Sequence, residues 1–550
     1  MVKKLFLLSV LAASAGTAWA AGTACEDMTK VNLPNTTITS ATLVPKGGFT
    51  PPRNNQGAGP QPGGPGGQAG PGGPGGGPGG PGGAGGPGGP GGPGGPGGGP
   101  GGNQNAVYTT LPAFCRVMAT VRAVPDSEVK VEVWMPVENW NGKLESLGNG
   151  GFSSSIQYNA LAGAVAEGYA ASGTNTGFDG NDSSFSIGHP EKETDWGNRA
   201  VHEMVVTAKA LIAAHYGDGP KYSYWNSCST GGRQGWVAAE YYPNDFDGLF
   251  IGDPANPMSR LQANSIYINL ALNTDPAAFI TPAKWTMIHK AVMDQCDEKD
   301  GLKDGLIQDP MKCNFPIDSL LCKSGDSDTC LTAPQLEALK KITTGSKNPR
   351  TGESLYPGYP LGTIMGSAPV TGHNPDNSAP STFKMLFQDA SWDYHTFDFD
   401  KDTARADKLG NNTINAVNPE KLKALFAHGG KIILYHGWED PAISPLEQIN
   451  LYEGAVKANG GLSKTYNEIR LFLIPSMPHC AGGYGPNAYD KMQVLSDWVE
   501  KGKAPDEIIA SHSTNGKVDR TMPLCPYPEL AKYKGTGSIM EAQNFVCAKP

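Results

Sequence analysis

The stretch KYSYWNSCSTGGRQGW, residues 221–236, decides the fold of this chain. It reads as a short aromatic strand, a sharp turn at Ser229 and the start of a helix that continues into VAAEYY. A serine between a strand and a helix, followed by small residues, is typical of a nucleophile elbow, which lifts the hydroxyl above a parallel sheet. Ser227 stands where that motif usually has its first glycine. A helix N-cap serine after a strand is the plainer alternative.

Strand and helix patterns alternate on both sides of the elbow. Residues 107–136 alternate as strands do, residues 248–255, 431–437 and 470–477 are short apolar runs, and residues 489–500 suggest a helix. A further helix is predicted over residues 198–216, where apolar side chains recur at helical spacing: Val201, Met204, Val205, Ala208, Leu211 and Ile212. This alternation predicts an α/β fold with a parallel sheet.

The pattern changes between residues 256 and 428, which hold helical pieces, four cysteines and many loops. Because sheet elements resume afterwards, this segment is predicted to be a lid over the carboxyl ends of the strands, where α/β folds place their sites. The catalytic domain is then formed by residues 21–45, 107–255 and 429–550.

Residues 46–106 are an insert of almost pure glycine and proline, mostly in Gly-Gly-Pro units. The three-residue register of collagen breaks at GGGP and GGAGG, so a continuous triple helix is not expected. The segment lacks apolar side chains and is predicted to be a flexible, partly extended excursion.

The N-terminus predicts export. Lys3 and Lys4 precede an apolar run and the small-x-small site Ala18-Trp19-Ala20, so residues 1–20 are predicted to be a cleaved signal peptide. No later run is long enough to span a membrane. Ten cysteines suggest a disulfide framework in a secreted or periplasmic protein. A net charge of -9 and no basic patch give no support to nucleic-acid binding.

An elbow serine needs a histidine base and a carboxylate, which follow it in the order acid then histidine in α/β-hydrolases. Asp440 follows the predicted strand KIILYHG, and His479 follows RLFLIPSM. We therefore predict Ser229, Asp440 and His479 as nucleophile, orienting acid and base. Glu439 and Asp253 are alternative acids, and His436 is the alternative histidine.

Two cysteines support this assignment. Cys228 directly precedes the predicted nucleophile, and Cys480 directly follows the predicted base. A disulfide holds two Cα atoms about 5.5–6 Å apart. A bridge between these cysteines would therefore place Ser229 and His479 within hydrogen-bond reach.

An oxyanion hole needs backbone N–H donors preset toward the developing charge. One is expected from Thr230, the residue after the nucleophile. The other is expected from the glycine-rich loop after LESL, at Asn149 or Gly150. A plain turn is the alternative for that loop.

The segment CDEKDGLKDGLIQDPMKC, residues 296–313, gathers Asp297, Asp300 and Asp304 around two Asp-Gly turns. Carboxylates drawn together repel unless a cation neutralises them. Oxygen ligands suit Ca²⁺, which also takes backbone carbonyls, here those of Leu302 and Leu306. The alternative is a solvated acidic turn closed by a Cys296–Cys313 bridge.

The Cys-Ser-x-Gly-Gly elbow, the Asp440 loop and the His479-Cys480 pair resemble the tannase and feruloyl esterase family of serine esterases. The acidic loop is similar to the calcium site in that family's lid, and the ending from Arg520 to Cys547 also looks like the family's. The resemblance covers the chain from Cys25 onward, apart from the insert. It implies an α/β-hydrolase core with an inserted lid and a structural calcium. It also implies the pairs Cys25–Cys115, Cys228–Cys480, Cys296–Cys313, Cys322–Cys330 and Cys525–Cys547.

Together these observations predict an exported serine esterase that acts on small esters of aromatic acids, of the feruloyl type. Galloyl esters (a tannase) and mono(2-hydroxyethyl) terephthalate remain alternatives. The terephthalate relative uses a lid arginine for its substrate's carboxylate, and Arg405 is the nearest one after a stretch without arginine from 352 to 399. A serine peptidase, or a secreted binding protein on a hydrolase scaffold, is the alternative from another class.

Overall fold

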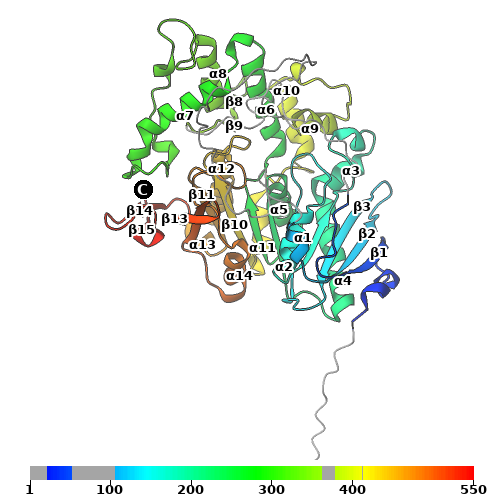
Figure 1. The fold of residues 1–550 in the computed structure, drawn as a ribbon. Helices are drawn as coiled ribbons and strands as arrows, with labels where there is room; N and C mark the ends of the chain where they lie inside the picture. Colours follow the sequence, from blue (N-terminus) through cyan, green and yellow to red (C-terminus); the bar gives the residue numbers. More distant parts are fainter. Residues whose placement is uncertain (1–21, 53–105, 362–377, 412) are drawn as a thin grey trace, which may run out of the picture.

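The computed structural model describes residues 22–52, 106–361, 378–411 and 413–550, which are built around a nine-stranded sheet (Figure 1). In spatial order its strands are β1 (Thr36–Val44), β2 (Phe114–Val121), β3 (Val129–Pro136), β5 (Ala170–Thr174), β4 (Lys143–Ser146), β6 (Tyr222–Cys228), β7 (Gly248–Gly252), β10 (Lys431–Gly437) and β11 (Ile469–Ile474). Neighbours from β5 to β11 pair in parallel, and β1, β2, β3 and β5 pair antiparallel. The predicted α/β fold is confirmed, with an antiparallel extension at the N-terminal edge.

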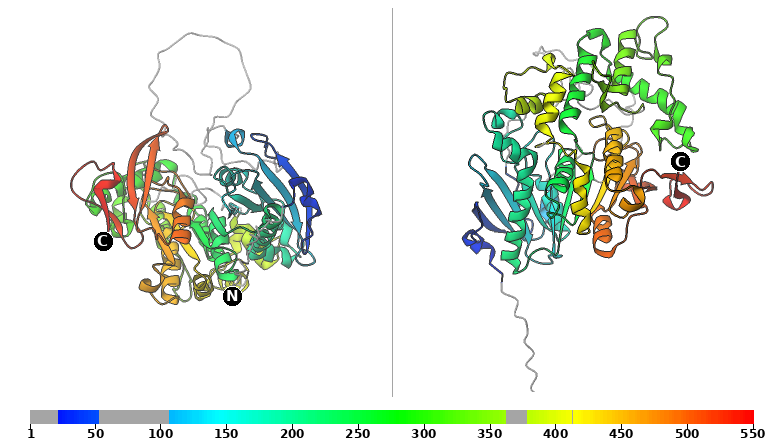
Figure 2. Two further views of the ribbon diagram at one scale, coloured as in Figure 1. Left: turned by 90° about the horizontal axis from the view of Figure 1, so that it is seen from below. Right: turned by 180° about the vertical axis from the view of Figure 1, so that it is seen from behind.

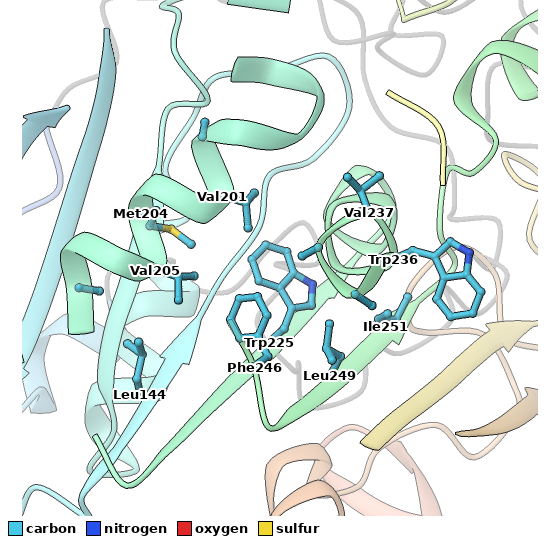
Figure 3. Packing of buried hydrophobic residues seen from close by; sticks show 14 of the residues in the cluster. Leu144, Val201, Met204, Val205, Trp225, Trp236, Val237, Phe246, Leu249 and Ile251 are labelled. Carbon is cyan, nitrogen blue, oxygen red and sulfur yellow. The ribbon is translucent and has the colours of Figure 1, made fainter. Parts of the chain in front are cut away.

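Helices cover both faces of the sheet. One layer contains α4 (Ala200–Tyr216), α5 (Thr230–Tyr241), α11 (Leu422–Ala427) and α12 (Pro445–Ala458); the other contains α1 (Ala106–Thr110), α2 (Tyr158–Ala166) and α14 (Lys491–Lys501). Figure 3 shows the first layer, with Trp225, Leu249 and Ile251 of the sheet against α4 and α5. Because both faces are covered, β7, β10 and β11 carry apolar runs of neighbouring residues and do not alternate apolar with polar ones.

The segment between β7 and β10 forms the predicted lid. Its main elements are α6 (Met258–Asn273), α7 (Pro282–Cys296), α8 (Ala333–Thr344), β8 (Gly345–Lys347), β9 (Ser354–Pro357), α9 (Ser378–Phe387) and α10 (Lys401–Gly410). Figure 1 shows these helices, green to yellow, gathered beyond one end of the sheet. The predicted end of the lid at residue 428 is too late. Leu422, Leu425 and Phe426 of α11 are buried in the core between the sheet and its first layer of helices.

The start of the Gly/Pro insert also differs from its predicted position at residue 46. Phe49 is 7% exposed and its ring lies 5.1 Å from that of Tyr108 and 4.5 Å from that of Trp134. Residues 46–52 therefore belong to the packed domain. The rest of the insert to residue 105 and the predicted signal peptide lie outside the described residues.

The chain ends in two small hairpins, β12 (Ile508–Thr514) with β13 (Lys517–Leu524) and β14 (Leu530–Tyr533) with β15 (Phe545–Ala548). They lie beside β11, and the red C-terminal hairpin lies near the green segments of the lid in the right-hand view of Figure 2. Within the described part of the chain, none of the helices combines the length and the apolar character that crossing a membrane requires.

Candidate active site

Ser229 lies at the turn between β6 and α5 in a strained backbone conformation, with φ 65° and ψ -125°. Its N–H donates to the Gly252 carbonyl oxygen at 3.0 Å, which holds the turn against β7. The helix then passes so close to the strand that a Cβ at Gly231 would lie 1.9 Å from Ser227 Oγ. Small residues after the serine are therefore required, and Ser227 is accommodated because Gly231 has no side chain. These features confirm the predicted elbow.

Ser229, His479 and Asp440 meet in one hydrogen-bonded chain. His479 Nε2 lies 2.9 Å from Ser229 Oγ, and His479 Nδ1 lies 2.7 Å from Asp440 Oδ2. The other oxygen of Asp440 accepts the N–H groups of Ala442 at 2.8 Å and Ile443 at 3.0 Å. Asp440 is fully buried, whereas the imidazole is 30% exposed. The residues that the sequence singled out thus have the geometry of a nucleophile, a base and an orienting acid.

The alternative acids and histidine lie around this chain and not within it. His436 is buried, with Nε2 3.0 Å from the Ile443 carbonyl and 3.3 Å from Asp440 Oδ2. Asp253 accepts the Gly437 N–H at 3.1 Å, and Glu439 accepts the Ser476 hydroxyl at 3.0 Å. His436 and Asp253 therefore shape the electrostatic surroundings of Asp440, whereas the imidazole at the Ser229 hydroxyl is that of His479.

The charges around His479 favour its protonated form. Burial lowers the pKa of His479, but the charge and hydrogen bond of Asp440 and the charge of Asp253 outweigh this and raise it above its ordinary value. Reciprocally, burial raises the pKa of Asp440, and the two histidines that contact it hold it well below the ordinary range. Asp440 is therefore a carboxylate throughout the neutral range.

The five disulfides pair as the family resemblance implies: Cys25–Cys115, Cys228–Cys480, Cys296–Cys313, Cys322–Cys330 and Cys525–Cys547. In the bridge beside the active site the two Cα atoms are 6.0 Å apart. It joins the residue before Ser229 to the residue after His479. The predicted role of this bridge in bringing the two side chains together is consistent with their 2.9 Å contact.

The predicted oxyanion loop approaches the elbow, and its two candidate donors differ. The Asn149 N–H already donates to Gln234 Oε1 at 3.0 Å, and Gln234 Nε2 donates back to Asn149 Oδ1 at 3.1 Å. Asn149 therefore anchors the loop to α5, and of the two residues Gly150 is the candidate whose N–H does not make this bond. Thr230 begins α5, where N–H groups have no partner within the helix. Its hydroxyl donates to the Gly151 carbonyl at 2.8 Å, a second tie to the loop.

A cavity of about 800 Å³ opens onto Ser229 and His479. On the lid side it is lined by Ala255, Met258, Leu261, Ala442 and Ile443, with the neutral polar side chains of Gln262, Ser265 and Ser378 among them. Gly150 and Thr230 line the same space. The arrangement can bind an apolar acyl group next to an activated serine.

Comparisons with known proteins agree with this geometry. The family model described as "Tannase and feruloyl esterase" matches residues 115–548. The chain belongs to the tannase and feruloyl esterase family. It is 35% identical to an uncharacterized esterase of Xanthomonas campestris pv. campestris, over 98% of this chain and 94% of that protein. It is 32% identical to the probable feruloyl esterase B-1 of Aspergillus oryzae, over 81% of this chain and 86% of that protein.

Solved structures extend the likeness to the whole fold. The crystal structure of feruloyl esterase B from Aspergillus oryzae superposes with a TM-score of 0.81 at 28% identity, covering 95% of this chain and 99% of that one. Tannin acyl hydrolase from Aspergillus niger shares the fold, with a TM-score of 0.70 at 22% identity over 80% and 87% of the two chains. Membership in the tannase and feruloyl esterase family makes this chain a carboxylic-ester hydrolase.

In the acidic loop, residues 296–313, the aspartate carboxylates accept hydrogen bonds from backbone N–H groups of the same loop. Asp297 accepts the N–H groups of Asp304 and Gly305, and Asp300 accepts those of Leu302 and Gln308. Asp304 Oδ1 accepts the Leu306 N–H at 3.1 Å, whereas its Oδ2 is buried without a hydrogen-bond partner. Burial raises the pKa of Asp304 to about 6, and the charges of Asp300 and Asp297 add to the shift.

Three side chains at this esterase site were not singled out from the sequence. Gln234 holds the oxyanion loop, Tyr435 and Lys491 line the cavity, and Lys491 Nζ donates to Tyr435 Oη at 2.8 Å. A tyrosine within an apolar strand is an ordinary core residue by its pattern, and a lysine at the start of a helix is ordinarily a surface residue. Of the three, only Gln234 has a position in the sequence, five residues after the nucleophile, that indicates a place near the site.

Proposed function

We propose that this chain is a secreted serine esterase that cleaves esters of hydroxycinnamic acids through an acyl-enzyme. The observation that carries the proposal is the imidazole of His479, which bridges the Ser229 hydroxyl and the Asp440 carboxylate. The predicted signal peptide and the five disulfides support secretion.

In the proposed reaction Ser229 Oγ attacks the ester carbonyl carbon while His479 Nε2 takes the hydroxyl proton. Asp440 holds the imidazole with its proton on Nδ1, so that Nε2 is free to accept. The N–H groups of Thr230 and Gly150 stabilise the oxyanion. His479 then returns the proton to the leaving alcohol, and a water molecule activated by the same nitrogen releases the acid from Ser229.

The lid side of the cavity supports an aromatic acid as the acyl group. Its apolar wall, with Gln262, Ser265 and Ser378, suits a phenolic ring with neutral oxygen substituents. Arg405 does not line this cavity; its guanidinium lies 4.1 Å from the Phe387 ring and donates to the Phe387 carbonyl oxygen at 3.4 Å. A carboxylate on the acid, as in a terephthalate monoester, therefore has no arginine partner among the described lining residues. The similarity to feruloyl esterase B favours a hydroxycinnamoyl group.

Parallel hydrolysis assays would test this proposal. Methyl ferulate, methyl gallate, mono(2-hydroxyethyl) terephthalate and a peptide amide are given to the purified protein. We expect the highest kcat/KM on methyl ferulate and none on the amide. A folded protein with intact disulfides that cleaves none of the esters would contradict the proposal and favour a binding role.

Replacing Gln234 with leucine is expected to lower kcat roughly tenfold to a hundredfold, less than the 10²–10³ typical of a deleted oxyanion donor. The change removes both hydrogen bonds to Asn149 and leaves a buried N–H unsatisfied, so the loop that carries Gly150 loses its anchor. Steady-state kinetics measure the effect. Gln493→Leu, an exposed change on α14, is the matched control, and an unaltered kcat in Gln234→Leu would show that the loop does not need this anchor.

The acid limb of the pH–rate profile is expected to lie above about 6.5, the ordinary pKa of histidine. Catalysis needs neutral His479, and Asp440 raises the pKa of that imidazole, so activity is lost as pH falls through the raised value. The measurement is kcat/KM from pH 5 to pH 10 on methyl 3,4-dimethoxycinnamate, which has no titrating group. An acid limb near pH 5 would contradict the raised pKa of His479.

We also propose that the acidic loop binds a structural Ca²⁺ through Asp297, Asp300 and Asp304 with the carbonyls of Leu302 and Leu306. Carboxylate and carbonyl oxygens are the ligands that calcium prefers. Asp304 Oδ2 is buried and accepts no hydrogen bond, which supports the proposal because a cation would satisfy it. Arg520 is an alternative source of positive charge for this oxygen, because its Nη1 lies 3.7 Å away.

Chelation is expected to lower the melting temperature by several degrees, and added calcium is expected to restore it. Ligand binding at 100 times Kd stabilises the folded state by about 2.7 kcal/mol. Differential scanning fluorimetry with EDTA and then excess CaCl₂ measures the effect. Asp304→Asn should reduce the calcium response, and Asp294→Asn, an exposed change on α7, should retain it. Equal curves with and without calcium would contradict the site.

A further inference from the structure

Arg233 is a fully buried cation that the proposed steps at Ser229 leave without a role. It lies in the first turn of α5, four residues after the nucleophile. Its guanidinium donates to three backbone carbonyls: Nη1 to Gly197 at 2.9 Å and to Ile414 at 3.0 Å, and Nη2 to Trp196 at 3.3 Å. Burial lowers the pKa of Arg233 to about 9, so the group is charged at neutral pH. A buried charge is costly unless polar groups compensate it, and these carbonyls do so.

The three carbonyls belong to two segments that are far apart in the chain. Two come from the π-helix η3 (Asp195–Arg199), and that of Ile414 comes from the segment that leads from α10 of the lid to α11 of the core. The segments are closely packed, since a Cβ at Gly197 would lie 2.6 Å from the Thr413 carbonyl oxygen. Arg233 therefore joins the elbow helix to η3 and to the exit of the lid.

The helix η3 carries Trp196, whose ring contacts both Arg233 and the residue after the oxyanion loop. Arg233 Cζ lies 4.3 Å from the centre of the Trp196 ring, within the range of a cation–π contact. The Phe152 ring stacks on the same indole, with ring centres 4.7 Å apart and 26° between the planes. Phe152 is buried and directly follows Gly151, which directly follows Gly150. A line of packed side chains thus connects Arg233 to the proposed oxyanion donor.

We propose that Arg233 is a positioning residue for the oxyanion loop and acts on it through Trp196 and Phe152. Before the proposed donor, the loop is tied to α5 by the hydrogen bonds between Asn149 and Gln234. After the donor, Phe152 holds the loop by packing, and the contact of Arg233 with Trp196 fixes where that ring can lie. The planar guanidinium suits this role because its donors have a fixed geometry. The inference rests on the proposed ester hydrolysis and adds a residue to its oxyanion site.

Arg233→Met is expected to lower kcat on methyl ferulate by about tenfold to a hundredfold, less than the loss of an oxyanion donor, while KM changes by less than about twofold. Two inhibitors separate a displaced donor from a damaged pocket. The styrylboronic acid that carries the ferulate ring forms an anionic tetrahedral adduct with Ser229, and its affinity should fall by about the same factor as kcat. Isoeugenol, which has the ring but no acyl carbonyl, should inhibit as it does the wild type.

Arg470→Met is the matched control. Arg470 is also buried, and its guanidinium lies 4.0 Å from the centre of the Tyr466 ring and donates to the Tyr466 carbonyl oxygen. It belongs to β11 and does not line the active-site cavity. Arg470→Met should lower the melting temperature but keep the wild-type kcat and both inhibition constants. Arg233→Lys, which keeps the charge without the planar fork, should retain part of the activity.

If Arg233→Met does not fold, Arg233→Lys and Phe152→Ala carry the test. Each should lower kcat and the affinity for the boronic acid together, and the double variant should fall little below the weaker single variant, because both changes act on one contact. A kcat of Arg233→Met equal to that of Arg470→Met, equal weakening of both inhibitors, or losses that multiply in the double variant would overturn this role alone. An inactive wild type would contradict the proposed ester hydrolysis and this role with it.

Discussion

Ser229→Ala is expected to lower kcat on methyl ferulate by about 10⁶-fold, the loss seen when the nucleophile of a serine hydrolase is removed. The reason is that Ser229 Oγ, which lies 2.9 Å from His479 Nε2, is the attacking atom. Without it the variant keeps the proposed oxyanion donors but has no nucleophile. Burst kinetics and covalent labelling by a fluorophosphonate, detected by mass spectrometry, measure the change. Both the burst and the label should disappear.

The matched control for this variant is Ser223→Ala. Ser223 lies on the same strand, β6, with its hydroxyl buried and without a hydrogen-bond partner. Its removal should leave activity and labelling as in the wild type. Labelling of Ser229→Ala at another serine, together with full activity, would show that the elbow serine is not the nucleophile.

Asp440→Asn is expected to lower kcat by about 10⁴-fold with little change in KM. An amide at this position offers an N–H to His479 Nδ1, which favours the tautomer with its proton on Nε2. That tautomer cannot accept the Ser229 proton. Because the charge of Asp440 also raises the pKa of His479, the acid limb of the residual activity should move to lower pH.

Two neighbouring carboxylates provide controls for Asp440. Glu439→Gln changes the adjacent residue, whose carboxylate accepts the Ser476 hydroxyl away from His479, and should cost a few-fold at most. Asp253→Asn should have an intermediate effect, because Asp253 contributes charge near His436 and His479 without contacting the latter imidazole. A loss in Asp253→Asn as large as in Asp440→Asn would transfer the orienting role to Asp253.

Local patterns determined much of this protein. The elbow around Ser229 is written in consecutive residues, because a strand, a turn and small residues before a helix depend on nearest neighbours. Asp440 and His479 were found for a related reason: each follows an apolar strand, and the carboxyl ends of parallel strands meet at one edge of the sheet. The flanking Cys228 and Cys480 then indicated their proximity. The pairing of the other cysteines came from the family resemblance, since many pairings fit any ten cysteines.

Tertiary structure alone decided the remaining features, because they depend on contacts between residues far apart in the chain. Asn149 meets Gln234 only because the loop after β4 packs against α5, and this contact occupies the N–H of Asn149, so that Gly150 is the loop residue we propose as oxyanion donor. The lid ends before α11 because Leu422 and Leu425 pack on the sheet, which their apolar character does not distinguish from packing within the lid. Lys491 faces the cavity because α14 begins beside Tyr435. Periodicity shows which face of an element is buried, and only packing shows against what.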